Sequence, residues 1–160
     1  MMLLTTSSNI FSQNTNDMAQ STNYTYATVP TQFVEANGIK FAYRSYGKTG
    51  GTPIIYLNHL AANLDNCDPR IMDAIAEQHQ IISFDYRGIG DTTGEQGESI
   101  PMMAQDAIAF IHALGYDQVD ILAFSLGGMV AQEVLLVEPN LFIKLSLQAL
   151  VQEVAKALVM

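Results

Sequence analysis

Short apolar runs alternate with amphipathic stretches along most of the chain. The runs have the length of buried strands and span residues 54–57, 80–84, 119–124 and 142–147. The stretches between them carry helical signals and span residues 68–78, 99–114 and 126–138. Continuously apolar strands that alternate with helices are typical of a parallel sheet with both faces covered. The pattern therefore predicts an α/β fold.

The first strands follow a different pattern. From Thr31 onward the side chains alternate between two faces, with Ile39 and Phe41 on one face and Lys40 on the other. Asn37-Gly38 separates two such runs, and this dipeptide suits the type I′ turn of a hairpin because both central residues need positive φ. We therefore expect an antiparallel hairpin ahead of the parallel strands.

Two of the predicted helices carry clear end signals. Asp68-Pro69 opens the first, which places Ile71 and Ile75 on one face. Ser99 is the expected N-cap of the second, and Gly115 ends it. The apolar stripe of this second helix consists of Ala107, Phe110, Ile111 and Leu114.

The two ends of the chain differ from this central part. Residues 1–29 are rich in Ser, Thr, Asn and Gln and contain no Lys or Arg, which predicts a disordered polar tail rather than a signal peptide. Met18 is an alternative start. We assign residues 30–148 to one partial domain and expect residues 149–160 to form a helix of their own.

Charge and cysteine content narrow the class of partner. A net charge of −9 argues against nucleic acid and against an anionic membrane surface, since both attract basic proteins. The lone Cys67 cannot form an intramolecular disulfide, which agrees with a reducing compartment and a cytoplasmic location. Lys144, Glu153 and Lys156 interrupt the C-terminal apolar run, so we expect no transmembrane span.

Two glycine-containing stretches resemble nucleotide-binding motifs, and neither satisfies the full pattern. Gly47-Lys48-Thr49 would need a glycine at position 42, which is Ala, and a helix after it. Gly88-Ile89-Gly90 lacks a third glycine at the required spacing and a helix that opens there. No cluster of His, Cys, Asp or Glu has metal-ligand spacing. We expect neither a cofactor nor a metal.

A serine stands where the strand at 119–124 meets the next helix. Such a sharp turn exposes the Ser125 hydroxyl at the tip of the sheet and points the N–H of Leu126 at the same spot. Ala123 and Gly127 must be small, because strand and helix nearly touch there. The pattern suits a catalytic nucleophile. From residues 121–138 alone, a serine that caps a buried helix is an equal alternative.

Four segments together resemble the α/β-hydrolase family. They are QFVEANGIKFAYRSYG, LNHLAANLDNCDP, SFDYRGIGDTTG and ILAFSLGGMVAQEVLLVEP, in the order of the family. The resemblance covers residues 31–147 and is nearest to small bacterial esterases and cofactor-free haloperoxidases. It implies a mostly parallel sheet and acyl transfer from a small ester-like substrate through a serine nucleophile.

The resemblance also assigns roles to individual residues. Ser125 matches the nucleophile, and the backbone N–H of Leu126 matches one oxyanion donor. The second donor belongs to the loop Asn58-His59-Leu60, so it is the N–H of Leu60, or of Ala61 if the alignment is shifted by one. The positions expected to support the site by packing are Arg87, Gly88 and Cys67, the last where the family often has a tryptophan.

The histidine that a serine nucleophile needs is missing after Ser125. Among the three histidines, we expect His112 on a helix surface and His79 at the opposite edge of the sheet. His59 lies at the correct edge, but the family uses this position to shape a loop, so we do not favour it as the base. It would also need a carboxylate to orient it. The available carboxylates are Asp65, Asp85 and Asp91.

The resemblance stops near residue 147. Gln148 stands where some relatives carry the catalytic acid. We therefore expect a chain truncated after about the sixth strand, whose exposed last edge can pair with another chain. Three interpretations stay open: an esterase-like serine hydrolase, a catalytically inactive fragment, and an assembly module that completes its sheet with a partner. We expect this chain alone to be inactive, because it lacks the usual catalytic histidine.

Overall fold

The computed structural model describes residues 24–148. Its elements are β1 (Gln32–Ala36), β2 (Ile39–Gly47), β3 (Ile54–Leu57), η2 (Leu64–Asn66), α2 (Pro69–Ala76), β4 (Gln80–Phe84), α3 (Ile100–Ala113), β5 (Val119–Phe124), α4 (Leu126–Val137) and β6 (Phe142–Gln148). Every strand and helix expected in this range is present. The helix expected over residues 149–160 and the tail expected over residues 1–23 lie outside the described residues.

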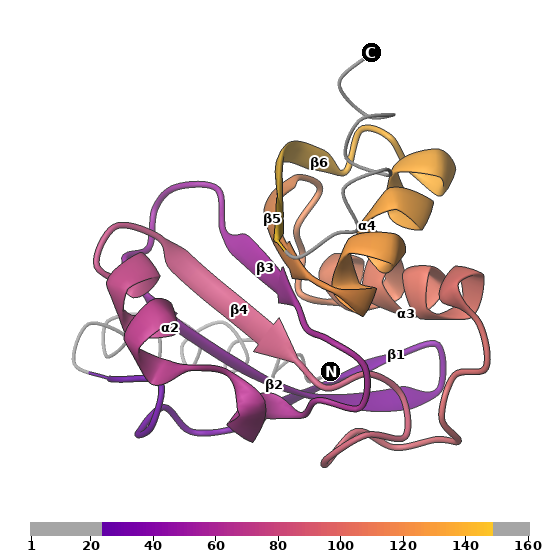
Figure 1. The fold of residues 1–160 in the computed structure, drawn as a ribbon, viewed down its shortest axis with the longest axis horizontal. Helices are drawn as coiled ribbons and strands as arrows, with labels where there is room; N and C mark the ends of the chain where they lie inside the picture. Colours follow the sequence, from indigo (N-terminus) through magenta and orange to yellow (C-terminus); the bar gives the residue numbers. More distant parts are fainter. Residues whose placement is uncertain (1–23, 149–160) are drawn as a thin grey trace, which may run out of the picture.

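One six-stranded sheet runs through the molecule in the strand order β1-β2-β4-β3-β5-β6 (Figure 1). β1, β2 and β4 pair antiparallel, and β4, β3, β5 and β6 are parallel neighbours. Asn37 and Gly38 have φ of 50° and 77°, as the predicted type I′ hairpin requires. The structure thus confirms an α/β fold with an antiparallel start.

Helices cover both faces of the sheet. α3 and α4 pack on one face, and α2 packs on the other (Figure 1). The alternation along β4 explains this arrangement, since Ile82 and Phe84 enter the first cluster while Ile81 enters the second. The strands are apolar on both sides because both sides are buried.

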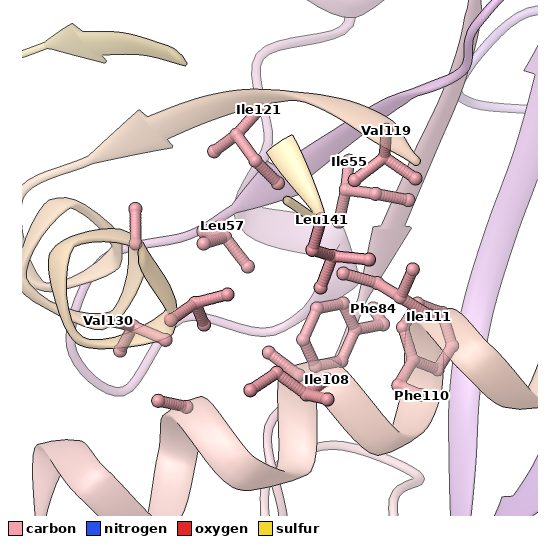
Figure 2. Packing of buried hydrophobic residues seen from close by; sticks show 14 of the residues in the cluster. Ile55, Leu57, Phe84, Ile108, Phe110, Ile111, Val119, Ile121, Val130 and Leu141 are labelled. Atoms are coloured by element: carbon pink, nitrogen blue, oxygen red, sulfur yellow. The ribbon is translucent and has the colours of Figure 1, made fainter. Parts of the chain in front are cut away.

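The larger core lies between the sheet and α3 (Figure 2). Phe110 stacks on Phe84 of β4 with 4.3 Å between ring centroids. Ala107 and Ile111 of the same helix face are also fully buried, which confirms the predicted stripe. Burial of each large side chain contributes about 1.5–3 kcal/mol, so this face holds α3 on the sheet.

The buried face of α2 differs from the predicted one. Met72 and Ala76 are buried, whereas Ile71 is 51% exposed and Ile75 is partly covered. Both pairs are spaced by four residues, so helical periodicity could not choose between them. The contact of Met72 with the second core cluster decides which pair is buried.

Residues 24–29 also differ from the disordered tail that we expected up to residue 29. Tyr26 is 2% exposed, and its hydroxyl donates to the carbonyl of Leu64 at 2.7 Å. Its N–H donates to the carboxylate of Asp73 in α2 at 2.7 Å. The polar composition of residues 1–29 concealed an aromatic anchor that belongs to the fold. Between residues 24 and 148, no helix is both long and apolar enough to cross a membrane.

Candidate active site

Three loops begin at the same edge of the sheet. β4, β3 and β5 are neighbouring parallel strands, and Leu57 at the end of β3 lies opposite Ala123 of β5. The carboxyl ends of parallel neighbours meet at one edge, so Asn58, Asp85 and Ser125 start adjacent loops. The structure thereby brings together loops that are far apart in the sequence.

Ser125 joins β5 directly to α4 in a strained backbone conformation. Its φ of 53° and ψ of −115° lie in a region that residues other than glycine rarely adopt. Its side chain is half-buried and forms no hydrogen bond within residues 24–148. A serine that served as a cap would accept a bond from an N–H of the first helical turn. The geometry therefore favours a hydroxyl available to a substrate over a helix cap.

Gly127 shows why this turn needs small residues. A Cβ added there would lie 2.1 Å from the carbonyl oxygen of Leu57, a distance that no side chain tolerates. Ala123 on the other side of the turn is completely buried. The close approach of α4 to β3 thus explains both small residues and fixes the position of Ser125 relative to the loop after β3.

The two expected oxyanion donors belong to residues that border one cavity. Within the described part of the chain, the N–H groups of Leu60 and Leu126 have no acceptor. The cavity has a volume of about 30 Å³. Its lining consists of Leu60, Ala61, Tyr86, Arg87, Ile89, Gln96, Gly97, Met103 and Leu126. An oxyanion requires fixed N–H donors that point at one position, and Leu60 and Leu126 remain the candidates for this role.

Ala61, in the loop after β3, has a backbone conformation that favours glycine. Its φ is 56°, in the left-handed region. The N–H of Ala62 donates to the carbonyl of His59 at 3.3 Å and closes the turn around it.

His59 lies at the same edge as Ser125. Its ring packs edge-on against Phe124 with 5.6 Å between centroids, and its Nδ1 lies 3.0 Å from the carbonyl oxygen of Leu60. Within residues 24–148 no hydrogen bond joins it to Ser125. A proton on Nδ1 would bond that carbonyl and leave Nε2 without a proton. The backbone rather than a carboxylate orients this ring.

The other two histidines lie where the sequence placed them. His112 is exposed on α3 and pairs with Glu138 at 2.8 Å. His79 is exposed and directly precedes β4, at the edge of the sheet opposite Ser125.

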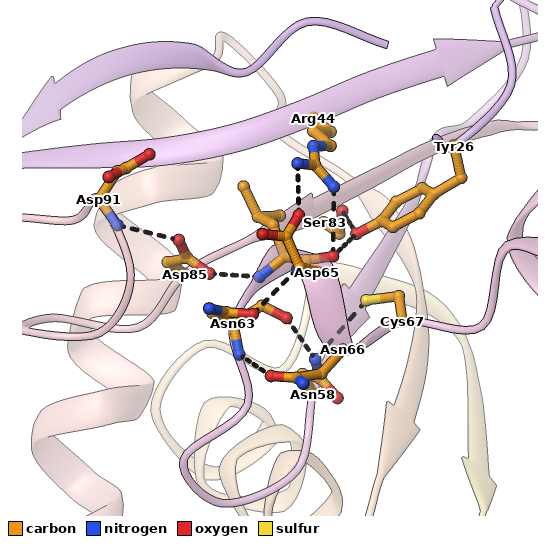
Figure 3. Close-up of polar contacts among 11 residues, drawn as sticks. Tyr26, Arg44, Asn58, Asn63, Asp65, Asn66, Cys67, Ser83, Asp85 and Asp91 are labelled. Carbon is orange, nitrogen blue, oxygen red and sulfur yellow. Dashed lines mark hydrogen bonds and ion pairs between the residues drawn. The ribbon is translucent and has the colours of Figure 1, made fainter. Parts of the chain in front are cut away.

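Two of the three carboxylates, Asp65 and Asp85, hold loops rather than His59, and Asp91 takes part through its backbone N–H (Figure 3). Asp65 pairs with Arg44 at 2.7 Å. Asp85 accepts hydrogen bonds from the N–H groups of Leu64 at 2.7 Å and Asp91 at 3.3 Å. Burial raises the pKa of Asp85, while these two bonds lower it. The expectation that one of them orients His59 has no support in the described contacts.

The loop after β4 is tied to α3. Arg87 Nε donates to Asp106 Oδ2 at 2.8 Å, and the Asp106 carboxylate is almost fully buried. At Gly88, where φ is 69°, an added Cβ would lie 2.5 Å from the Gln96 nitrogen. The supporting role expected of Arg87 and Gly88 agrees with these contacts. Asp106 was not predicted from the sequence. The one signal for its role is that it is a lone acidic residue within an apolar face of the predicted helix.

Cys67 sits in the smaller core beside Tyr26. It is 6% exposed, and burial raises the pKa of its thiol. Tyr26 and Tyr46 belong to the same cluster, so aromatic rings from other segments pack in this region. Figure 3 shows how the thiol faces Asn58, whose Nδ2 lies 3.6 Å from the sulfur.

Comparison with known proteins decides the family. A family model described as alpha/beta hydrolase fold matches residues 52–155. The chain belongs to the alpha/beta hydrolase family. This alpha/beta hydrolase is similar to an alpha/beta hydrolase fold protein from Chitinophaga pinensis, with 38% identity and a TM-score of 0.75 over 78% of this chain and 45% of that one. It is also similar to the epoxide hydrolase CorEH, with 27% identity and a TM-score of 0.67 over 74% and 41% of the two chains.

Curated relatives of this alpha/beta hydrolase have several activities. A poly(3-hydroxyalkanoate) depolymerase from Ectopseudomonas oleovorans is 31% identical over 111 residues, which is 69% of this chain and 38% of that protein. BpoC of Mycobacterium tuberculosis, which bears the name of a non-heme bromoperoxidase, is 30% identical over 64% of this chain and 39% of its own length. The chain thus spans about two fifths of the length of these relatives.

Proposed function

We propose that this chain carries the nucleophile-bearing part of a serine hydrolase that acts on a small ester-like substrate. Ser125 is the nucleophile, and the N–H groups of Leu126 and Leu60 hold the oxyanion. The observation that carries the proposal is the strained backbone of Ser125, whose hydroxyl has no hydrogen-bond partner in the described residues. The names of several relatives, among them a carbamate hydrolase and an esterase/lipase, support the same reaction class.

The reaction begins when Ser125 Oγ attacks the carbonyl carbon of the ester. The carbonyl oxygen becomes an anion, which the two N–H groups stabilise because they are fixed before the reaction starts. The alcohol then leaves with a proton, and water releases the acyl group from the serine. The cavity that Leu60 and Leu126 both border supports this role for their N–H groups.

Ser125 must give its proton to a base during the attack. His59 is the histidine at this edge, and the bond of its Nδ1 to the Leu60 carbonyl would leave Nε2 able to accept a proton. His59 fills this role only if its ring turns toward Ser125, since no described bond joins them. A histidine from another segment or chain is the alternative source of the base.

Labelling with a fluorophosphonate tests the nucleophile and the base. If this chain supplies its own base, the 160-residue chain is labelled and the Ser125→Ala variant remains unlabelled. If His59 is the base, His59→Ala lowers the labelling rate about 100-fold or more, which is the usual contribution of a general base. Equal labelling of wild type and Ser125→Ala would refute the nucleophile, and an unchanged rate in His59→Ala would exclude that histidine.

An assembly module is the second candidate, and the open side of β6 favours it. In the described sheet β6 pairs with β5 on one side and with no strand on the other. Ile143 of β6 is 51% exposed and Leu136 of α4 is 80% exposed. Unpaired strands with apolar side chains associate with other chains. Sedimentation should show a dimer that Ile143→Lys converts to monomer; a wild-type monomer at high concentration would contradict this candidate.

A further inference from the structure

Asn58 is the first residue after β3, and both polar atoms of its side chain are engaged, Nδ2 by the contacts drawn in Figure 3. Its Oδ1 accepts the N–H of His59 at 2.8 Å. Its Nδ2 donates to the carbonyl of Asn63 at 3.4 Å and lies 3.6 Å from the sulfur of Cys67. Asn58 is 4% exposed, so these groups replace water that it cannot reach.

The backbone of Asn58 makes two further contacts. Its carbonyl accepts the hydroxyl of Tyr86, from the loop after β4, at 3.4 Å. The same carbonyl oxygen lies 2.9 Å from the position of a Cβ added at Gly127, so the first turn of α4 packs directly against it. Asn58 therefore meets the turn at η2, the loop after β4 and the turn at Ser125. Leu60, which carries the candidate oxyanion donor, follows two residues later.

We infer that Asn58 is a positioning residue that fixes the Leu60 N–H relative to Ser125, an inference that rests on the proposed function. The bond from His59 N–H to Oδ1 sets the first peptide of the loop, and the bond from Nδ2 to Asn63 ties that peptide to η2. The loop carries backbone strain at Ala61, so without these bonds it relaxes away from the turn at Ser125. A donor displaced by about 1 Å loses much of its effect on the transition state.

The alternative is that Asn58 merely stabilises the fold, and a matched variant separates the two roles. Asn66 lies in η2 and its Oδ1 accepts the N–H of Asn63 at 2.9 Å. Asn66→Ala therefore weakens the same turn without removing a contact of Asn58. Asn58→Ala removes both side-chain bonds, and Asn58→Asp keeps the acceptor for His59 while it lacks the Nδ2 donor.

The first readout is hydrogen exchange at the Ala62 amide, which donates to the His59 carbonyl and has no bond to Asn58. We expect its exchange to quicken about tenfold in Asn58→Ala and less in Asn58→Asp, with the amides of β5 unchanged. Exchange in Asn66→Ala should equal that of wild type. If Asn58→Ala does not fold, Asn58→Asp carries the comparison. Equal Ala62 exchange in the Asn58 and Asn66 variants would overturn the inference.

The second readout is the fluorophosphonate labelling rate of Ser125. It should fall about 100-fold in Asn58→Ala and stay at the wild-type value in Asn66→Ala. An equal fall in both variants would assign Asn58 a structural role and overturn the inference. If the wild-type chain is not labelled, the proposed activity fails for this chain alone, and Ala62 exchange still decides whether Asn58 holds the loop.

Discussion

The turn at Ser125 and the loop at Ala61 lie at the same edge of the sheet and hold their strain in different ways. Each contains a non-glycine residue at positive φ, 53° at Ser125 and 56° at Ala61. At Ser125 the strain is held by backbone packing, because α4 approaches the Leu57 carbonyl too closely for any side chain at Gly127. On either side of Ala61 the loop is tied by side chains, since Asn58 accepts the N–H of His59 and Asp85 accepts the N–H of Leu64. The packed turn therefore tolerates no side chain at Gly127. The polar contacts of the other loop change when a side chain is replaced or when Asp85 changes its protonation state.

The largest expected effect comes from Gly127→Ala, which disrupts the backbone packing at the turn of Ser125. The added methyl group would overlap the Leu57 carbonyl, so α4 must move from the sheet. We expect a loss of about 3 kcal/mol in the free energy of unfolding, measured by urea denaturation with circular dichroism. Gly51→Ala is the control, since no atom lies within 4 Å of its added Cβ. Equal midpoints for both variants would contradict the packing account.

The next largest effect is a pH dependence of the free energy of unfolding, which arises from Asp85 in the contacts of the Ala61 loop. Burial raises its pKa, Asp91 raises it further, and two backbone bonds and Arg44 lower it. Because its folded pKa is raised, stability from the protonated form is present below the unfolded pKa and lost as pH rises through the folded pKa. Relative to Asp85→Asn, the wild type should lose stability just above the ordinary carboxyl range, by at most about 1.4 kcal/mol per pH unit.

Urea midpoints of the wild type and Asp85→Asn across acidic pH measure this difference. Parallel curves would show that Asp85 titrates alike in the folded and unfolded chains. If the wild type instead becomes more stable relative to Asp85→Asn as pH rises, the backbone hydrogen bonds lower the pKa of Asp85 more than burial raises it.

The smallest effect is expected from Ala61→Gly. Glycine relieves the left-handed strain and loses more chain entropy on folding, so the net gain is about 0.5 kcal/mol. Ala61→Val should instead lose about 1 kcal/mol, since a branched side chain resists this conformation. Thermal unfolding of the three proteins measures both changes. A glycine variant less stable than the wild type would show that Ala61 carries no relievable strain.

The sequence predicted the elements well because their end signals are local. Ser99 accepts the N–H of Met102 as the N-cap of α3, and Gly115 has φ of 84° beyond its end. The buried face of α2 was mispredicted because burial depends on the partner surface. The same cause hid Tyr26, whose partners Leu64 and Asp73 are distant in the sequence.

The sequence predicted the part of the candidate site whose geometry follows from the single turn between β5 and α4. The requirement for small residues around Ser125 could be read from the strand–helix junction, and the contact at Gly127 agrees with it. The network of Asn58 was not predicted, because its partners come from separate loops that meet through the strand order. The periodicity of apolar residues along the chain carries no information on the order of the strands in the sheet.

The burial of Tyr26 makes the ultraviolet spectrum a report on the N-terminal turn. The chain has seven tyrosines and no tryptophan, so its near-ultraviolet absorption is dominated by phenol rings. Burial raises the pKa of Tyr26, and burial and the bond to Asp73 raise that of Tyr46 beside it. In alkali these two phenols stay protonated while they remain packed. Burial also raises the pKa of Tyr56 and of Tyr86, so the part of a late phenolate rise that is lost in Tyr26→Phe marks the unpacking of residues 24–29.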